Sequence, residues 1–137
     1  MKFFHLVCAS FLGAAIASPA VAGCTDSDLS GTWKLIAWST DRSDLVWDSC
    51  TVTVPQGGSN ISGTQCVHSN GKTHVFRKGV FNVASDCSVS GKFKAGKTSE
   101  NFVHGQMNLD KASFSVVGIS KIGRKTDGTF VVYATKQ

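Results

Sequence analysis

The sequence predicts an all-β fold, a closed antiparallel up-and-down barrel of about eight strands over residues 28–136. Between Thr32 and Trp38, the residues Trp33, Leu35 and Ala37 alternate with residues of the opposite face. A period of two is that of a strand with at least one buried face. Gly, Asn, Asp and Ser interrupt the chain at short intervals, and no stretch has sustained helical periodicity. A β-sandwich of the same strands is the alternative.

Residues 1–22 are predicted to be a secretory signal peptide rather than part of the fold. Lys2 is a minimal positive region, Phe3–Ala17 is an uncharged apolar stretch, and Ser18–Ala22 supplies small residues for cleavage. The apolar stretch is shorter than the ~20 residues that a transmembrane helix needs. Residues 23–137 then form a single domain, secreted or periplasmic.

The stretch Val21–Cys24 also matches a bacterial lipobox, which would attach a lipid to Cys24. Cysteine counting favours soluble export over this alternative. Of five cysteines, Cys8 leaves with the leader, and an even set of four remains. An even set in an oxidising compartment favours two disulfides, whereas lipidation of Cys24 would leave one cysteine unpaired.

The charge of the mature domain is modest. Without Lys2, 13 basic and 9 acidic side chains remain, a net charge of +4. The basic residues lack the interleaved aromatic residues that single-strand binders use, and an exported protein rarely meets nucleic acid. We therefore expect no nucleic-acid partner.

Turn signals divide the domain into its strands. Asn70-Gly71 is the strongest hairpin signal, because a type I′ turn needs positive φ at both central residues. Gly79 suggests a bend or a bulge within its strand. The predicted strands are residues 30–38, 50–54, 61–67, 73–83, 88–93, 101–109, 112–121 and 129–136.

The cysteine spacing favours one of the three possible disulfide pairings. If Val54 faces Ser62 across the loop at residues 55–60, Cys50 lies opposite Cys66. Directly opposed residues on antiparallel strands are ~4.5–5.5 Å apart at Cα, which is within disulfide reach. By remainder Cys24 pairs with Cys87 and ties the N-terminal segment to the barrel.

The segment Asp28-Leu29-Ser30-Gly31-Thr32-Trp33 resembles the start of calycin-type barrels, which include lipocalins, avidins and bacterial secreted metalloprotease inhibitors. The resemblance implies that Trp33 plugs one end of the barrel, with a basic side chain from the last strand across it. In an up-and-down barrel the end of the last strand lies beside the start of the first. Lys136 is therefore the expected partner of Trp33 in a cation–π contact.

The sequence shows no catalytic or metal-binding motif, so we expect a protein that is not an enzyme and has no cofactor. The mature histidines are His68, His74 and His104. A two-residue Asn70-Gly71 turn would place His68 and His74 on opposite faces of their hairpin, which argues against a shared metal site.

Three amphipathic aromatic residues, Trp38, Trp47 and Tyr133, are the candidates for lining the barrel mouth and binding a ligand. For Trp38 and Trp47, core packing is an equal alternative. The favoured function is binding of a small apolar or amphipathic ligand by an exported, non-enzymatic barrel.

The alternative function is inhibition or binding of an exported protein such as a secreted protease. The resemblance to the bacterial inhibitors implies it, because in that family the stretch before the first strand enters the target's active site. The matching stretch here is Gly23–Leu29. A disulfide at Cys24 would hold this stretch near the barrel and limit its reach.

Overall fold

The computed structural model describes residues 23–137, except 42–43, 58–60, 62–63, 77 and 96. The predicted signal peptide lies outside the described residues. The described residues form one short 3-10 helix and nine antiparallel strands in a single sheet. The elements are η1 (Asp26–Leu29), β1 (Gly31–Asp41), β2 (Asp44–Val54), β3 (Thr64–His68), β4 (Thr73–Phe76), β5 (Lys78–Val83), β6 (Val89–Ala95), β7 (Thr98–Met107), β8 (Ser113–Ile122) and β9 (Lys125–Lys136).

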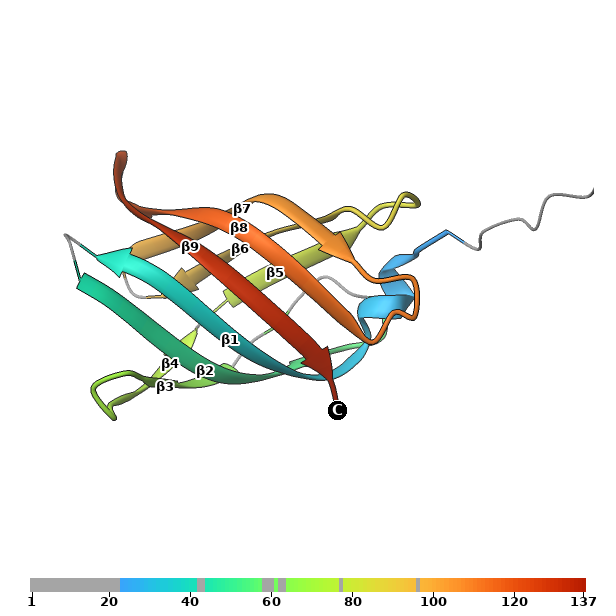
Figure 1. The fold of residues 1–137 in the computed structure, drawn as a ribbon, viewed down its shortest axis with the longest axis horizontal. Helices are drawn as coiled ribbons and strands as arrows, with labels where there is room; N and C mark the ends of the chain where they lie inside the picture. Colours follow the sequence, from blue (N-terminus) through green and yellow to red (C-terminus); the bar gives the residue numbers. More distant parts are fainter. Residues whose placement is uncertain (1–22, 42–43, 58–60, 62–63, 77, 96) are drawn as a thin grey trace, which may run out of the picture.

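The structure confirms the predicted all-β, up-and-down barrel, which is nearly closed. The strand order is β4-β3-β2-β1-β9-β8-β7-β6-β5, so each strand pairs with a sequence neighbour except where β9 meets β1. Figure 1 shows β1, β9 and β8 side by side, with η1 at the end of the barrel where β9 finishes. β1 and β2 are longer than the predicted strands: β1 continues to Asp41, and β2 already begins at Asp44.

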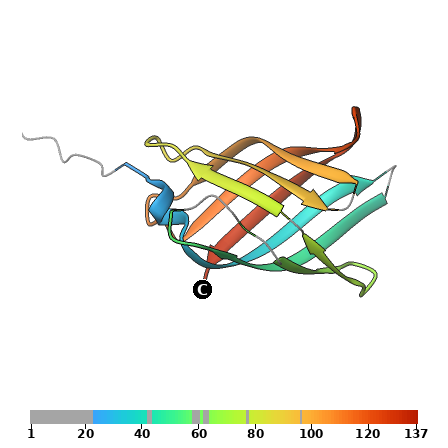
Figure 2. The same cartoon turned by 180° about the vertical axis from the view of Figure 1, so that it is seen from behind.

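The barrel has its seam between β4 and β5, on the side shown in Figure 2. The sequence predicts one strand over residues 73–83, and this is wrong, because β4 and β5 are separate edges of the sheet. Ile61, from the β2–β3 connection, pairs with the β5 edge: its N–H and C=O both form 2.9 Å hydrogen bonds with the main chain of Gly79. A side chain at Gly79 would collide with Ile61, so the bend predicted there is a close approach of two segments.

The core is a column of side chains inside the barrel. Its largest fully buried members include Trp33, Phe81 and Phe114. Phe81 stacks on Phe102 with ring centroids 5.3 Å apart, and meets Phe93 edge-on at 4.7 Å. Each fully buried side chain of this size stabilises the fold by ~1.5–3 kcal/mol, so packing of the barrel interior dominates stability.

Two disulfides join the barrel, with the pairing that the cysteine spacing favours. Cys50 lies opposite Cys66 in the β2–β3 register, with Cα atoms 4.1 Å apart. Cys24 pairs with Cys87 and ties the segment before η1 to the β5–β6 connection. The predicted pairing of Val54 with Ser62 is not tested, because Ser62 lies outside the described residues.

In the part of the chain that the structure describes, no helix has the length and apolar character needed to cross a membrane.

Candidate functional site

One end of the barrel, here called the plugged end, is filled by Trp33. Its indole is 1% exposed, donates a 2.7 Å hydrogen bond from Nε1 to the carbonyl oxygen of Leu29, and packs against Phe114. Lys136 is directly opposite Trp33 in the β1–β9 register, and its Nζ lies 5.5 Å from the ring centroid. The structure therefore places Trp33 and Lys136 together at the plugged end.

The other end, here called the cavity end, contains a cavity of about 60 Å³. Its wall is mainly apolar and includes the rings of Phe76, Phe93 and Phe130. Such a wall with a few polar groups is typical of small-ligand sites. The remaining lining residues are Leu35, Ala37, Ser39, Asp48, Cys50, Val52, Thr64, Glu100 and Val132.

Asp48 and two histidines form a polar group at this cavity. The His68 Nδ1 lies 2.9 Å from Asp48 Oδ1, and the His74 Nε2 lies 3.8 Å from the same oxygen. The side chains of Asp48, His68 and His74 are 19%, 26% and 36% exposed. Water and small solutes therefore reach the polar side of the cavity.

The expectation that His68 and His74 face opposite sides is wrong. Cys66 pairs with His74 across β3 and β4, so both histidines share the inner face with Cys66, and their ring centroids are 6.1 Å apart. Val67 pairs with Thr73, and the His68 N–H donates a hydrogen bond to the carbonyl oxygen of Lys72, so the register differs by one residue from that of a two-residue turn at Asn70-Gly71. A shift of one residue moves every side chain to the other face.

Within the described residues, no group of three or more His, Cys, Asp or Glu side chains has the arrangement to hold a metal ion.

Glu100 is the second carboxylate of the cavity, and sequence reasoning missed it. It lies opposite Ser120 in the β7–β8 register, and the Ser120 hydroxyl donates a hydrogen bond to Glu100 Oε2. Burial raises the pKa of the Glu100 carboxyl above its ordinary value, and the negative charges of Asp48 and Asp127 act in the same direction. Ionisable groups whose pKa is shifted by burial and by neighbouring charges cluster at functional sites.

A β-bulge explains why Glu100 faces inward. The register of β7 shifts between Phe102 and His104, so Val103 has no partner on β8. On one side of the bulge Glu100 and Phe102 face the interior, and on the other side Met107 does. Strict alternation along this strand would place Glu100 and Met107 on opposite faces.

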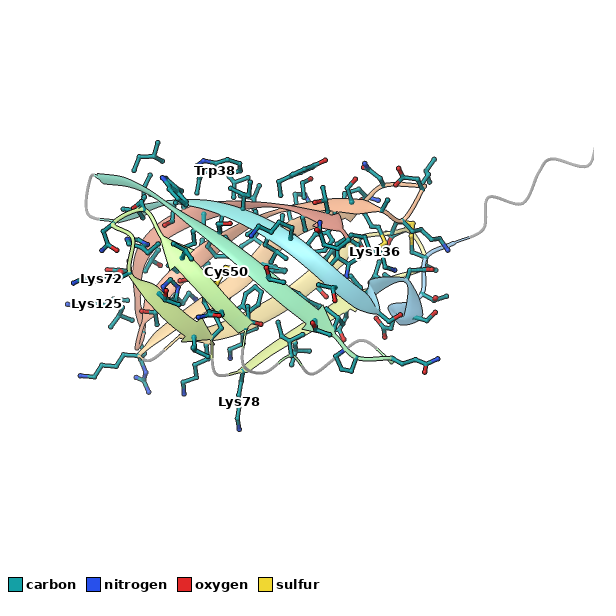
Figure 3. The ribbon with its side chains drawn as sticks, turned by 90° about the horizontal axis from the view of Figure 1, so that it is seen from below. Trp38, Cys50, Lys72, Lys78, Lys125 and Lys136 are labelled. Carbon is teal, nitrogen blue, oxygen red and sulfur yellow. A yellow bond between two sulfur atoms is a disulfide. The ribbon has the colours of Figure 1, made fainter. Side chains whose placement is uncertain are left out.

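The three aromatic residues predicted to line the mouth lie on the outer surface instead. Trp38, Trp47 and Tyr133 are 40%, 43% and 47% exposed, and none lines the cavity. Figure 3 shows Trp38 on the outside of the barrel. The alternation that places Trp33 inside also places Trp38 outside, so the outward position of Trp38 could have been predicted from the strand pattern.

These aromatic residues belong to a continuous patch across four strands, here called the outer apolar face. Its members are Ile36, Trp38, Trp47, Val117, Val131 and Tyr133. Trp38 pairs with both Trp47 and Val131, and Val131 pairs with Val117. Contiguous exposed apolar patches of this kind mark interaction surfaces in soluble proteins.

Comparisons with known proteins establish the fold only. No family model matches the chain, and no curated protein matches it. Solved structures do match, and the chain is similar to designed β-barrels. A de novo designed fluorescence-activating barrel has a TM-score of 0.59 and 14% identity over 83% of this chain and 99% of its own.

Two of the similar designed barrels were solved with the compound DFHBI bound. One, mFAP2b, has a TM-score of 0.59 and 14% identity over 83% of this chain and its whole length. The other, mFAP1, has a TM-score of 0.57 and 17% identity over 82% of this chain and 98% of its own. At this identity the likeness shows a shared small-barrel architecture.

Proposed function

We propose that this protein is an exported, non-enzymatic β-barrel that binds a small ligand at the cavity end. The observation that supports this function most strongly is the cavity, which has an apolar wall with three phenylalanine rings and a polar side at Asp48 and Glu100. The two disulfides support export, because disulfides persist in oxidising compartments. The likeness to barrels solved with a small molecule bound supports ligand binding as a use of this architecture.

The cavity limits the size of what it holds. A dry cavity of roughly 150 Å³ accepts benzene in another protein, and the cavity here is about 60 Å³. The site therefore suits a ligand with a short, slender buried part. The probe for the test is n-propanol, which is small, neutral and amphipathic.

Two neighbouring residues on β1 provide matched variants for this test. Ala37 lines the cavity, whereas Ile36 faces outward and is 38% exposed. In a ¹H–¹⁵N NMR titration of the oxidised protein, n-propanol should shift the backbone amides of the cavity lining. Ala37→Leu should abolish these shifts by filling the cavity, and Ile36→Leu should leave them unchanged. Absence of shifts in the unsubstituted protein, or equal shifts in Ala37→Leu, would overturn the proposal.

A second candidate function, binding of a partner protein, rests on the outer apolar face. Tryptophan and tyrosine are the residue types that dominate binding energy in protein interfaces, and this face exposes Trp38, Trp47 and Tyr133. Insertion of the Gly23–Leu29 stretch into a protease cleft is less well supported, because Leu29 is fully buried and Cys24 is disulfide-bonded.

The protein-binding candidate is tested by residual activity of secreted metallo- and serine proteases in the presence of this protein. Inhibition that Trp38→Ser removes and Ala37→Leu preserves would support the outer apolar face. Undiminished protease activity at a large molar excess would count against inhibition of the enzymes assayed.

A further inference from the structure

The charges that line the cavity are of one sign. Asp48 and Glu100 contribute carboxylates from β2 and β7, and no lysine or arginine is among the described lining residues. The rest of the lining is mainly apolar. A ligand that enters this cavity therefore meets two acidic groups that are partly buried.

The two carboxylates differ in the side chains that lie next to them. Asp48 has His68 and His74 beside it. Glu100 has the neutral hydroxyl of Ser120 as its hydrogen-bond donor, and no described Lys, Arg or His nitrogen lies within 4.0 Å of its oxygens. The cavity thus offers a carboxylate whose counter-charge is not supplied by the described side chains.

The aromatic part of the wall suits the same kind of ligand. Phe76 and Phe93 line the cavity with ring centroids 5.3 Å apart, and Phe130 completes the aromatic lining. The faces of aromatic rings attract cations, and the attraction is strongest when the cation is desolvated. Carboxylates combined with phenylalanine rings form an environment that favours an ammonium group over a neutral or anionic one.

We propose that the ligand of the cavity end is a small primary amine, whose ammonium group binds between Asp48 and Glu100 and whose short alkyl chain packs against Phe76, Phe93 and Phe130. This inference rests on the proposed function and specifies the class of ligand. The ligand need not gain a proton in order to bind, because alkylammonium ions already carry their charge at neutral pH.

Lysines near the cavity end do not reverse this preference. Lys72 and Lys125 lie at this end, opposite Lys136 (Figure 3), and both are exposed. Exposed charges are screened over ~8 Å at physiological salt, whereas partly buried charges are screened much less. The carboxylates that line the cavity therefore act on a bound ligand more strongly than the lysines of the rim.

The test compares three probes of equal chain length, n-propylammonium, n-propanol and propionate, by NMR titration of the oxidised protein at pH 7. We expect n-propylammonium to shift the cavity-lining amides at concentrations at least tenfold lower than n-propanol, and propionate to cause no shift there. Equal binding of n-propanol and n-propylammonium would overturn the amine assignment and leave the proposed function standing. No shift with any probe would overturn the proposed function itself.

Variants locate the charge that recognises the amine. Glu100→Gln keeps a side chain of the same shape beside Ser120 and should weaken n-propylammonium binding about tenfold without changing that of n-propanol. Asp110→Asn removes an exposed carboxylate from the β7–β8 connection at the plugged end and should change neither. Unchanged amine binding in Glu100→Gln would overturn the role of this residue.

A measurement on the unsubstituted protein covers the case in which Glu100→Gln does not fold. Amine binding should strengthen as the pH rises and the carboxylates ionise, whereas n-propanol binding should not strengthen in parallel. An amine affinity that is independent of pH between 4 and 8 would contradict the proposal.

Discussion

The ammonium group of Lys136 lies over the indole of Trp33 and also donates a 3.1 Å hydrogen bond to the carbonyl oxygen of Asp28. One side chain from the last strand thus contacts both the first strand and the helix η1 that precedes it. Because η1 also receives the Nε1 hydrogen bond of Trp33 at Leu29, these contacts hold the plugged end together.

Replacing Lys136 tests this arrangement. Lys136→Met keeps a long apolar side chain but removes the charge, so the cation–π contact and the hydrogen bond to Asp28 are lost. We expect the free energy of unfolding to fall by about 1 kcal/mol, measured by urea denaturation. Lys125→Met, at the exposed start of β9, is the control and should have little effect. Equal stability of the two variants would contradict a stabilising role for Lys136.

The two disulfides should differ in their contribution to stability. Cys24–Cys87 closes a sequence separation of 63 residues and Cys50–Cys66 one of 16. In the chain-entropy model these loops correspond to about 4 and about 3 kcal/mol. Replacing each pair by alanines should therefore cost more stability at Cys24–Cys87, measured by urea denaturation at pH 7. All four sulfurs belong to buried residues, so the loss of packing is similar in both variants.

The stability of the barrel should depend on pH through Glu100. Its pKa is raised above the ordinary 4.5, mainly by burial. Below pH 4.5 both the folded and unfolded states hold the proton. Above it the unfolded chain releases the proton first, so stability falls until the raised pKa of the folded state is passed.

Glu100→Gln removes this dependence. The variant should be more stable than the unsubstituted protein at pH 7, and the difference should shrink as the pH falls towards 4.5 and disappear below it. Urea denaturation at a series of pH values measures this. A variant that is less stable at pH 7 would contradict the inferred burial of the carboxylate.

The three tryptophans should differ in how readily a quencher in solution reaches them. Trp33 is 1% exposed, whereas Trp38 and Trp47 are 40% and 43% exposed. In a variant with Trp38 and Trp47 both replaced by phenylalanine, the remaining emission should be shifted to shorter wavelength and iodide should quench it weakly. The unsubstituted protein should be quenched strongly. Weak quenching in both proteins would indicate that the outer apolar face is covered in solution.

Gly118 should be needed for the shape of the cavity. A methyl group added there would overlap the ring of Phe130, which lines the cavity, and approach the carbonyl oxygen of Asn101. Gly118→Ala should therefore destabilise the fold by ~1–3 kcal/mol and alter n-propanol binding. Ser115→Ala, at an exposed position of the same strand, should do neither. Wild-type stability of Gly118→Ala would contradict this packing.

Much of the barrel can be predicted from local pattern. The period of two in β1 places Trp33 and Leu35 inside, and the spacing of the cysteines favours Cys50 opposite Cys66. The position of Lys136 beside Trp33 follows from the antiparallel closure of β9 on β1. Burial alternates along most of a strand and pairing is antiparallel, so these relationships need no knowledge of distant contacts.

The candidate site was decided by tertiary structure. A β3–β4 register one residue away from that of a two-residue turn places both His68 and His74 inside, and the bulge at Val103 allows Glu100 and Met107 to share the interior. A one-residue change in turn length or register reverses the face of every later side chain. Such a change cannot be predicted from composition or from the alternation of apolar residues, because it depends on how the strands pack around the core. The sequence by itself determined the barrel and its plug, and only the closed sheet brought Asp48 and Glu100 to one cavity.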